Sequence, residues 1–299
     1  MFDCVIIGGG TAGMTAAIYL LRAGKSAMIL ESTALGGQIT ASARIENFPG
    51  LLGVSGIEYA DKLAEQVFHF GGQIEPVEVK EVRKEGDHFM IETTDDERYE
   101  AKSVIIATGA AHRHLGLPRE EELPGVSYCA VCDGAFYKGK DVAVVGGGNS
   151  AVQSALTLAD LCKKVTLIHR REGFRAEPVL LERLRSLANV EIRTGGVVSE
   201  LQGEDKLSSV EVTFGEEKEI LPIDGLFIAV GQKPANEPFA ALVDLDEEGY
   251  IVAGEDCCTR TKGVYAAGDC RQKAVRQLVT AAGDGATAGL AAVRYLDEN

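Results

Sequence analysis

The chain has 299 residues and carries 45 acidic side chains against 30 basic ones, which gives a net charge of −15. This excess of negative charge repels nucleic acid and anionic lipid, so no nucleic-acid partner is expected. The length favours two domains of ordinary size, and a hydrophobic content of 45% with 35 glycines is typical of an α/β protein rich in tight turns.

The N-terminal part of the chain predicts a strand, a glycine turn, a helix and a second strand. A short apolar run indicates a buried strand at 2–7, apolar positions on one face indicate a helix at 11–23, and a strand at 26–30 ends at Glu31. Residues 4–21 carry no charge and are long enough to span a membrane. Three consecutive glycines interrupt them and no basic segment precedes them, so no membrane association is expected.

The same strand–helix–strand pattern returns later in the chain. The remaining expected elements are strands at 73–82, 88–93 and 103–107, a strand at 141–145, a helix at 150–161, a strand at 164–168, a helix near 177–187, strands at 190–193, 209–214 and 225–230, a strand-like run at 263–269 and a final helix from about 277. Such alternation predicts an α/β fold with two Rossmann-like dinucleotide-binding domains. Because the C-terminal segment is too short to stand alone, the second domain, expected at 116–244, would be inserted into the first, expected at 1–115 and 245–299.

The first glycine-rich loop has the spacing of a dinucleotide site. Gly8 permits a sharp turn, Gly10 lets the backbone approach a pyrophosphate, and Gly13 allows the helix to pack on the strand. The helix N-terminus would face the phosphates, and Glu31, 18 residues after Gly13, would accept the ribose hydroxyls.

The second loop contains Gly146, Gly148 and Ser150 and is followed by a different residue type. Where a ribose with free hydroxyls would need an acid, the chain has a basic cluster, namely His169, Arg170, Arg171 and Arg175. Guanidinium groups bind phosphate bidentately, so this cluster suits the 2′-phosphate of NADPH. The alternative is a solvated basic face on an acidic protein.

A Cys-x-x-Cys pair followed by an acid precedes the second loop. A zinc site would need a second Cys or His pair, and no such paired motif accompanies Cys129 and Cys132, so no metal is expected. A redox dithiol is the better interpretation, with Asp133 able to move the proton that each half-reaction requires. The total of seven cysteines is odd and irregularly spaced, which indicates reduced thiols in the cytoplasm, and packing roles are favoured for the other five.

Two dinucleotide loops and one dithiol together indicate electron flow from a nicotinamide through a second nucleotide cofactor to a disulfide. In these motifs and their order, the chain resembles the bacterial low-molecular-weight thioredoxin reductases over essentially its whole length. The matching segments are 8–13, 36–40, 46–50, 107–109, 129–134, 146–151, 169–175, 268–269 and 276–277. The family often has Thr where this chain has Val131, a mild variation.

The resemblance implies an enzyme that uses FAD and NADPH to reduce thioredoxin, and a homodimer. It places FAD in the first domain and NADPH in the second. It also adds further residues to the flavin site, namely Gly37, Gln38, Asn47, Asp269, Arg276 and Gln277.

Two rival functions stay open at this stage. One is a flavoenzyme of the same architecture that is driven by ferredoxin or oxidises small dithiols; the intact second loop and its arginines count against ferredoxin. The other is a nucleotide-binding redox sensor without enzymatic activity, which the absence of any basic recognition element disfavours.

Overall fold

The chain folds into two compact units, one inserted into the other. The computed structural model describes residues 1–42 and 44–299. The first unit comprises Met1–Ala111 and Lys233–Asn299, and the second comprises His112–Gln232. This insertion confirms the predicted organisation. No helix within the described residues is both long and apolar enough to cross a membrane.

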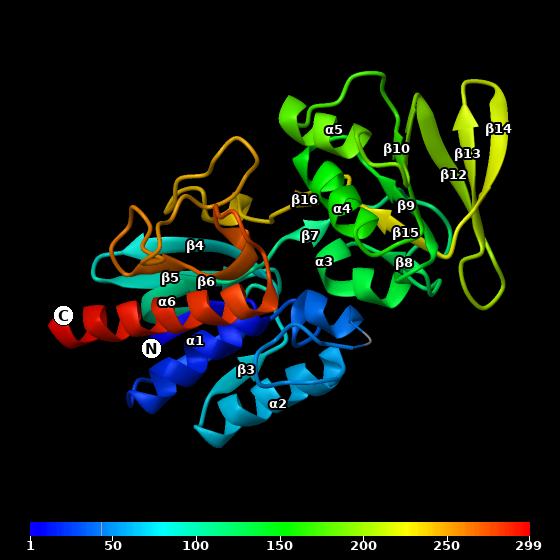
Figure 1. Ribbon diagram of the computed structural model, residues 1–299. Helices are drawn as coiled ribbons and strands as arrows, with labels where there is room; N and C mark the ends of the chain where they lie inside the picture. Colours follow the sequence, from blue (N-terminus) through cyan, green and yellow to red (C-terminus); the bar gives the residue numbers. More distant parts are fainter. Residues whose placement is uncertain (43) are drawn as a thin grey trace. The chain divides into compact units, whose positions relative to one another are not determined.

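A seven-stranded mixed sheet forms the centre of the first unit (Figure 1). Its strands are β1 (Phe2–Ile7), β2 (Ala27–Leu30), β3 (Gln73–Glu75), β4 (Val79–Glu85), β5 (His88–Thr93), β6 (Arg98–Ile106) and β17 (Val264–Ala266). The order is β3-β2-β1-β6-β5-β4, and β17 also pairs with β6. Strands β3, β2, β1, β6 and β17 are parallel to one another. Strand β5 pairs antiparallel with both β6 and β4.

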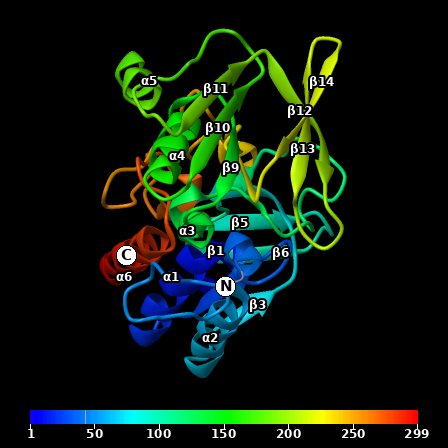
Figure 2. The same cartoon turned by 45° about the vertical axis from the view of Figure 1, so that its right-hand side comes forward.

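Apolar cores lie on the two faces of this sheet. On one face, helices α1 (Thr11–Arg22), α2 (Gly56–His69) and α6 (Leu278–Glu298) contribute to a cluster that includes Met14, Val67 and Ala288. Helices α1 and α6 lie side by side in both views (Figures 1 and 2). On the other face, Phe89 and Ile251 belong to a second cluster. The central parallel strands β1, β2 and β17 are largely buried, as their apolar runs predict.

The boundaries of the inserted unit differ from the expected 116–244. Phe239 at the end of η3 (Glu237–Phe239) is 2% exposed and packs in the second core cluster of the first unit, together with Leu242 and Val243. Burial of this apolar segment against the first sheet places 233–244 in the first unit. The connecting strands β7 (Ala111–His112) and β16 (Gln232–Lys233) pair with each other where the chain passes between the units.

Two features of the first unit were not predicted correctly. The single strand expected at 73–82 is wrong: β3 and β4 lie at opposite edges of the sheet. Pro76 separates them, and proline has no backbone N–H with which to continue a ladder. Helix α2 is absent from the predicted elements, although Ser55 and Glu58 have the Ser-x-x-Glu spacing that marks a helix start. Ser55 is the N-cap of this helix, and its Oγ accepts from the Glu58 N–H at 3.1 Å.

The second unit is built on a five-stranded parallel sheet in the order β11-β10-β9-β15-β8, whose strands are labelled in Figures 1 and 2. Its strands are β8 (Val126–Ser127), β9 (Asp141–Val145), β10 (Lys164–His169), β11 (Val190–Thr194) and β15 (Gly225–Ile228). Helices α3 (Ala130–Asp133), α4 (Asn149–Ala159) and α5 (Pro178–Arg185) contribute to a core that includes Ala130, Leu158 and Leu184. A separate antiparallel sheet consists of β12 (Gly196–Gln202), β13 (Ser209–Phe214) and β14 (Glu217–Pro222), of which only β13 was predicted.

Candidate active site

The first unit carries the predicted glycine turn between β1 and α1. Gly8 has a φ of 109°, and a Cβ atom at Gly13 would lie only 1.9 Å from the Gly8 carbonyl oxygen. Any side chain at Gly13 would therefore force α1 away from the end of β1. Gly10 is the N-cap and offers no side-chain hydrogen bond. The first N–H groups of α1 are thus left for an anionic ligand, as a pyrophosphate site requires.

Glu31 lies beside this turn, where β2 ends. Its Oε2 accepts from the Gly9 N–H at 2.6 Å, and its Oε1 accepts from the Thr33 N–H at 2.8 Å and the Thr33 hydroxyl at 2.9 Å. The residue is 9% exposed. The carboxylate is therefore fixed next to the glycine turn, and its remaining lone pairs can accept ribose hydroxyls.

Asp269 follows β17 in the short helix η4 (Gly268–Cys270) and approaches the same turn. A Cβ atom at Gly268 would lie 2.8 Å from the Cβ of Ala12, in the first turn of α1. Within the described residues, Asp269 Oδ1 is buried without a hydrogen-bond partner. Burial raises the pKa of this carboxyl. A buried oxygen without a donor indicates that a polar ligand group completes the site.

The other predicted flavin residues of the first unit are linked to this framework by hydrogen bonds. Gln38 in η1 (Gly37–Ala41) donates through Nε2 to the Ala110 carbonyl, and Asn47 Nδ2 donates to Gln277 Oε1 at 3.2 Å. The Arg276 guanidinium lies 4.0 Å from the centre of the Tyr250 ring. Gly37 itself has a φ of 62°.

Asp284 is a supporting residue that the sequence analysis missed. Its carboxylate accepts from Arg271 Nε and Nη2, each at 2.8 Å, from Lys273 Nζ at 2.8 Å, and from the Gly268 N–H at 3.0 Å. Burial alone would raise the pKa of Asp284, but the hydrogen bonds and charges of the two cations outweigh burial and lower it. Asp284 therefore anchors the turn that carries Asp269. Its position within a helix far along the chain gave no sequence signal.

The second unit repeats the glycine turn between β9 and α4. Gly146 has a φ of 150°, and Gly148 is the N-cap of α4 without a side-chain hydrogen bond. Ser150 is exposed in the first turn of this helix. These residues lie together, as the sequence predicted, at a helix N-terminus suited to a pyrophosphate.

His169 is buried, unlike the exposed arginines with which it was grouped. It ends β10, is 8% exposed, and its Nε2 is 3.2 Å from the Gly173 carbonyl oxygen. Because a carbonyl only accepts, Nε2 carries the proton. Burial, together with the nearby arginine charges, lowers the pKa of His169. A Cβ atom at Gly147 would lie 2.1 Å from this ring, so His169 supports the glycine turn from beneath as a neutral side chain.

Arg170, Arg171 and Arg175 are exposed around the loop that follows β10. Among the described residues, none of the three has a carboxylate within 4.0 Å. The Arg175 N–H donates to the Gly147 carbonyl at 2.8 Å and joins this loop to the glycine turn. Three unpaired guanidinium groups at this place can bind a phosphate bidentately.

The dithiol is present as a disulfide between Cys129 and Cys132, with their Cα atoms 5.3 Å apart. Cys129 is the N-cap of the one-turn helix α3, and its Sγ accepts from the Cys132 N–H at 3.2 Å. Both cysteines are half-buried. In the reduced form, this N–H would favour a thiolate on Cys129.

Asp133 is hydrogen-bonded beside the disulfide. Its Oδ2 accepts from the Ser127 hydroxyl at 2.6 Å, and its N–H donates to the Cys129 carbonyl at 3.0 Å. Burial raises the pKa of Asp133, and the Ser127 hydrogen bond offsets part of that effect. A carboxyl group with a raised pKa, one residue along the chain from a disulfide, is a candidate for proton transfer.

The other five cysteines are free, and all except Cys258 are buried. Burial raises the pKa of the Cys4 and Cys257 thiols to about 12 and that of Cys270 to about 11. Such thiols are poor nucleophiles at neutral pH. Within residues 1–42 and 44–299, no group of three or more His, Cys, Asp or Glu side chains is arranged to hold a metal ion.

Comparison with known proteins agrees with this geometry. Residues 2–285 match the family described as pyridine nucleotide-disulphide oxidoreductase. A thioredoxin reductase of Helicobacter pylori is 45% identical over 311 aligned residues that cover all of both chains, and that of Bacillus subtilis is 40% identical over all of this chain and 96% of its own. The crystal structure of thioredoxin reductase from Streptococcus pyogenes superposes with a TM-score of 0.96 at 43% identity, over all of this chain and 99% of the other.

The chain belongs to the pyridine nucleotide-disulphide oxidoreductases and, among them, to the thioredoxin reductase family. It is an oxidoreductase, and its cofactors are FAD and NADPH, as the sequence predicted. The residues of the first unit fit a dinucleotide: the uncapped N-terminus of α1 would face its phosphates, and Asp269 Oδ1 has no partner among the described residues. The exposed arginines of the second unit fit the 2′-phosphate.

Replacement of Asp284 by Asn should destabilise the first unit by about 3–5 kcal/mol, because buried Arg271 loses its counter-charge. Since the pKa of Asp284 is lowered by folding, its contribution is complete above its unfolded pKa of about 3.9 and is lost as pH falls through the folded pKa. Urea unfolding at pH 7 and below pH 4 measures this difference, which should shrink at low pH. The control Asp297→Asn, on the same helix, breaks an exposed pair with Lys25 and should cost less than about 1 kcal/mol.

Replacement of Arg170, Arg171 or Arg175 by Ala should each raise the KM for NADPH about tenfold or more, since a hydrogen bond to a charged group contributes about 1.5–3 kcal/mol. The KM for NADH should hardly change. Steady-state kinetics with both nucleotides provide the measurement, with Arg185→Ala, an exposed arginine on α5, as the control. Equal use of NADH and NADPH by the unaltered enzyme would contradict the assignment.

Proposed function

We propose that this protein is an NADPH-dependent thioredoxin reductase, in which electrons pass from NADPH through FAD to the Cys129–Cys132 disulfide and then to oxidised thioredoxin. The observation that carries the proposal is the disulfide itself, formed within the unit that also holds the arginine-lined nucleotide loop. We assign FAD to the unit of residues 1–111 and 233–299, and NADPH to the unit of residues 112–232. The relatives from Helicobacter pylori and Bacillus subtilis both carry the name thioredoxin reductase.

The flavin site would be formed by residues that surround the first turn of α1. Gly8, Gly10 and Gly13 shape the turn for the pyrophosphate, and Glu31 accepts ribose hydroxyls. Asp269 would supply an acceptor, because its Oδ1 has no hydrogen-bond partner among the described residues. The remaining contacts come from Gly37, Gln38, Asn47, Arg276 and Gln277.

The reduced dithiol performs the transfer to thioredoxin. The Cys129 thiolate attacks one sulfur of the substrate disulfide and forms a mixed disulfide, and the first substrate thiolate leaves. Cys132 then attacks Cys129, the enzyme disulfide re-forms, and the second substrate thiolate leaves. Two electrons and two protons thus pass from the enzyme thiols to the substrate thiols, and Asp133 carries protons between them.

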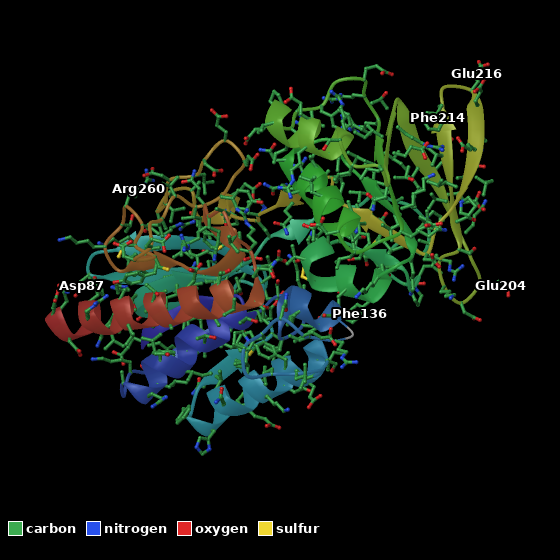
Figure 3. The ribbon with its side chains drawn as sticks, viewed as in Figure 1. Asp87, Phe136, Glu204, Phe214, Glu216 and Arg260 are labelled. Carbon is green, nitrogen blue, oxygen red and sulfur yellow. A yellow bond between two sulfur atoms is a disulfide. The ribbon has the colours of Figure 1, made fainter. Side chains whose placement is uncertain are left out.

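The surroundings of the dithiol suit a protein substrate in the cytoplasm. Val131, between the two cysteines, is 63% exposed, and Phe136 projects from η2 (Gly134–Tyr137) with 40% exposed (Figure 3). Exposed apolar side chains beside a reactive pair can contact a protein partner. The five free cysteines are compatible with a reducing compartment.

The double variant Cys129→Ser, Cys132→Ser should abolish thioredoxin reduction while FAD stays bound and is still reduced by NADPH. The reason is that the variant keeps both nucleotide sites and loses only the sulfurs. Anaerobic absorbance of the flavin and a thioredoxin-coupled assay separate the two steps. Cys258→Ser, a change at an exposed free cysteine, should keep full activity. Thioredoxin reduction by the double variant would overturn the proposal.

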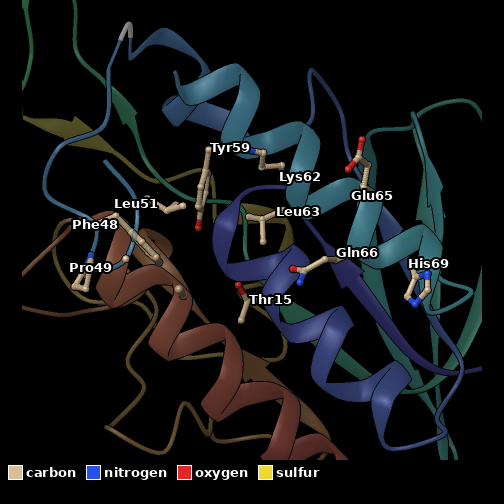
Figure 4. Close-up of a pocket in the computed structure, with 12 residues that line it drawn as sticks. Thr15, Phe48, Pro49, Leu51, Tyr59, Lys62, Leu63, Glu65, Gln66 and His69 are labelled. Carbon is tan, nitrogen blue, oxygen red and sulfur yellow. The ribbon is translucent and has the colours of Figure 1, made fainter. Parts of the chain in front are cut away.

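We further propose that the chain acts as a homodimer through the first unit. A groove of about 820 Å³ lies between α1, α2, α6 and the loop at 48–51 (Figure 4). The Phe48 and Tyr59 rings, with centroids 5.6 Å apart, line it. Leu52 and Ile57 near its rim are 82% and 58% exposed. Apolar exposure of this extent on adjacent elements is typical of subunit interfaces.

Sedimentation velocity should therefore give a species of twice the chain mass. Leu52→Glu and Ile57→Glu should shift the equilibrium toward the monomer, because each would place a charge in an apolar interface. Ile220→Glu, at a residue 48% exposed on β14 of the second unit, should leave the dimer intact. A monomeric unaltered protein at micromolar concentration would refute this assembly.

A further inference from the structure

Ser127 lies between the acid and the backbone of the reactive pair. It is the last residue of β8, is 5% exposed, and pairs with Phe227 of β15. Its Oγ donates to Asp133 Oδ2 at 2.6 Å and accepts from the Cys129 N–H at 3.1 Å. One hydroxyl therefore joins Asp133 to Cys129.

These contacts close a ring. The Asp133 N–H donates to the Cys129 carbonyl at 3.0 Å, the Asp133 carboxylate accepts from Ser127, and Ser127 accepts from the Cys129 N–H. Asp133 is thus linked to Cys129 twice: directly through its own N–H, and from its carboxylate through the Ser127 hydroxyl. Within the described residues, Ser127 is the only hydrogen-bond donor to this carboxylate. Without Ser127, no hydrogen bond from the described residues would fix the orientation of this carboxyl group.

We propose that Ser127 is a positioning residue for proton transfer at the dithiol, acting through Asp133. The inference rests on the proposed function of the Cys129–Cys132 pair and extends it to the residue that holds the acid in place.

The hydroxyl is suited to this role because its bonds survive the change in protonation of Asp133. A serine hydroxyl has one donor and two acceptor sites. It donates to Asp133 when the carboxylate is ionised, and it accepts from the carboxylic acid after protonation. In both states one acceptor site is left for the Cys129 N–H. Threonine offers the same sites, whereas alanine offers none.

The proton path can be written in full with this arrangement. As the Cys129 thiol becomes a thiolate and attacks the substrate disulfide, the Asp133 carboxylate takes its proton. Asp133 then returns the proton to the departing substrate thiolate. The Cys132 thiol follows the same course in the second exchange. Asp133 ends each exchange ionised, so Ser127 meets both of its forms in every turnover.

Few other titratable groups face Asp133. Tyr137 on η2 is the neighbour whose charge interacts with it, and burial, followed by the charges of Asp133 and Asp224, raises the pKa of Tyr137. Tyr137 is therefore neutral across the working range. The reduced thiols of Cys129 and Cys132 are the other titratable groups close to Asp133 along the described part of the chain. In a plot of kcat against pH, a shift of the acidic limb consequently reports on the pKa of Asp133.

The test compares Ser127→Ala, Ser127→Thr and Asp133→Asn in the holoenzyme. Ser127→Ala should lower kcat for thioredoxin reduction roughly tenfold, the effect of one hydrogen bond to a charged group. Because that bond lowers the pKa of Asp133 against burial, its loss should move the acidic limb to higher pH. Ser127→Thr keeps a hydroxyl, so its acidic limb should lie at the same pH as in the unaltered enzyme. The control Ser103→Ala removes a buried hydroxyl that donates to the Asp3 carbonyl in the first unit, and it should leave the limb in place.

A double-mutant cycle keeps the inference falsifiable if threonine does not fit. If Ser127 acts through Asp133, adding Ser127→Ala to Asp133→Asn should lower kcat less than about twofold further. Additive losses in the double variant, or an unmoved acidic limb in Ser127→Ala, would overturn the inference.

Infrared titration of the Asp133 carboxyl separates this inference from the proposed function. The protonated carboxyl band, identified by its loss in Asp133→Asn, should titrate at higher pH in Ser127→Ala than in the unaltered protein. This readout requires no thioredoxin activity. If the unaltered enzyme does not reduce thioredoxin, the proposed function fails, while an unchanged titration in Ser127→Ala would remove the role of Ser127 alone.

Discussion

The contact of a glycine with a neighbouring carbonyl sets the geometry of both nucleotide turns. A Cβ atom at Gly8 would lie 2.3 Å from the Ala107 carbonyl oxygen, and one at Gly146 would lie 2.3 Å from that of Ala229. The chain leaves β1 against the end of β6 in the first unit, and it leaves β9 against the end of β15 in the second, where no side chain fits. The helix can then begin directly above the sheet, with its N–H groups turned toward a ligand. The remaining site residues are arranged around these two turns.

The two copies of this plan diverge at one equivalent position. In each, the middle glycine of the triplet meets the side chain at the end of the second strand. Gly9 donates its N–H to Glu31 at 2.6 Å, whereas Gly147 packs against the His169 ring. An acid at this place accepts ribose hydroxyls, while a neutral imidazole supports the turn and leaves the surface to arginines. Under the proposed assignment, the residues at the end of the strand that follows the helix would set which dinucleotide each unit binds.

The repeated strand–turn–helix units were predictable because their signals are local: an apolar run, a glycine turn and a helical face. The break at Pro76 could also have been read from the sequence. Other residues gave no such signal. Asp284 anchors the Asp269 turn from a helix that joins the sheet only through tertiary packing, and His169 was grouped with arginines because burial is not visible in a linear charge pattern. The boundary at 233–244 depended on Phe239 packing against a sheet formed much earlier in the chain.

The dithiol is organised differently from the nucleotide sites. Its acid, its positioning hydroxyl and both sulfurs lie within residues 127–133, and their hydrogen bonds are formed between residues at most six apart. The proposed flavin site instead combines residues from 8 to 277, joined by contacts such as Asn47 to Gln277. In the proposed mechanism, proton transfer depends on one short segment, while electron supply depends on the whole fold. A substitution in the segment should alter the exchange chemistry without displacing the cofactors, whereas loss of a distant anchor such as Asp284 should disturb the cofactor and leave the local geometry of the sulfurs intact.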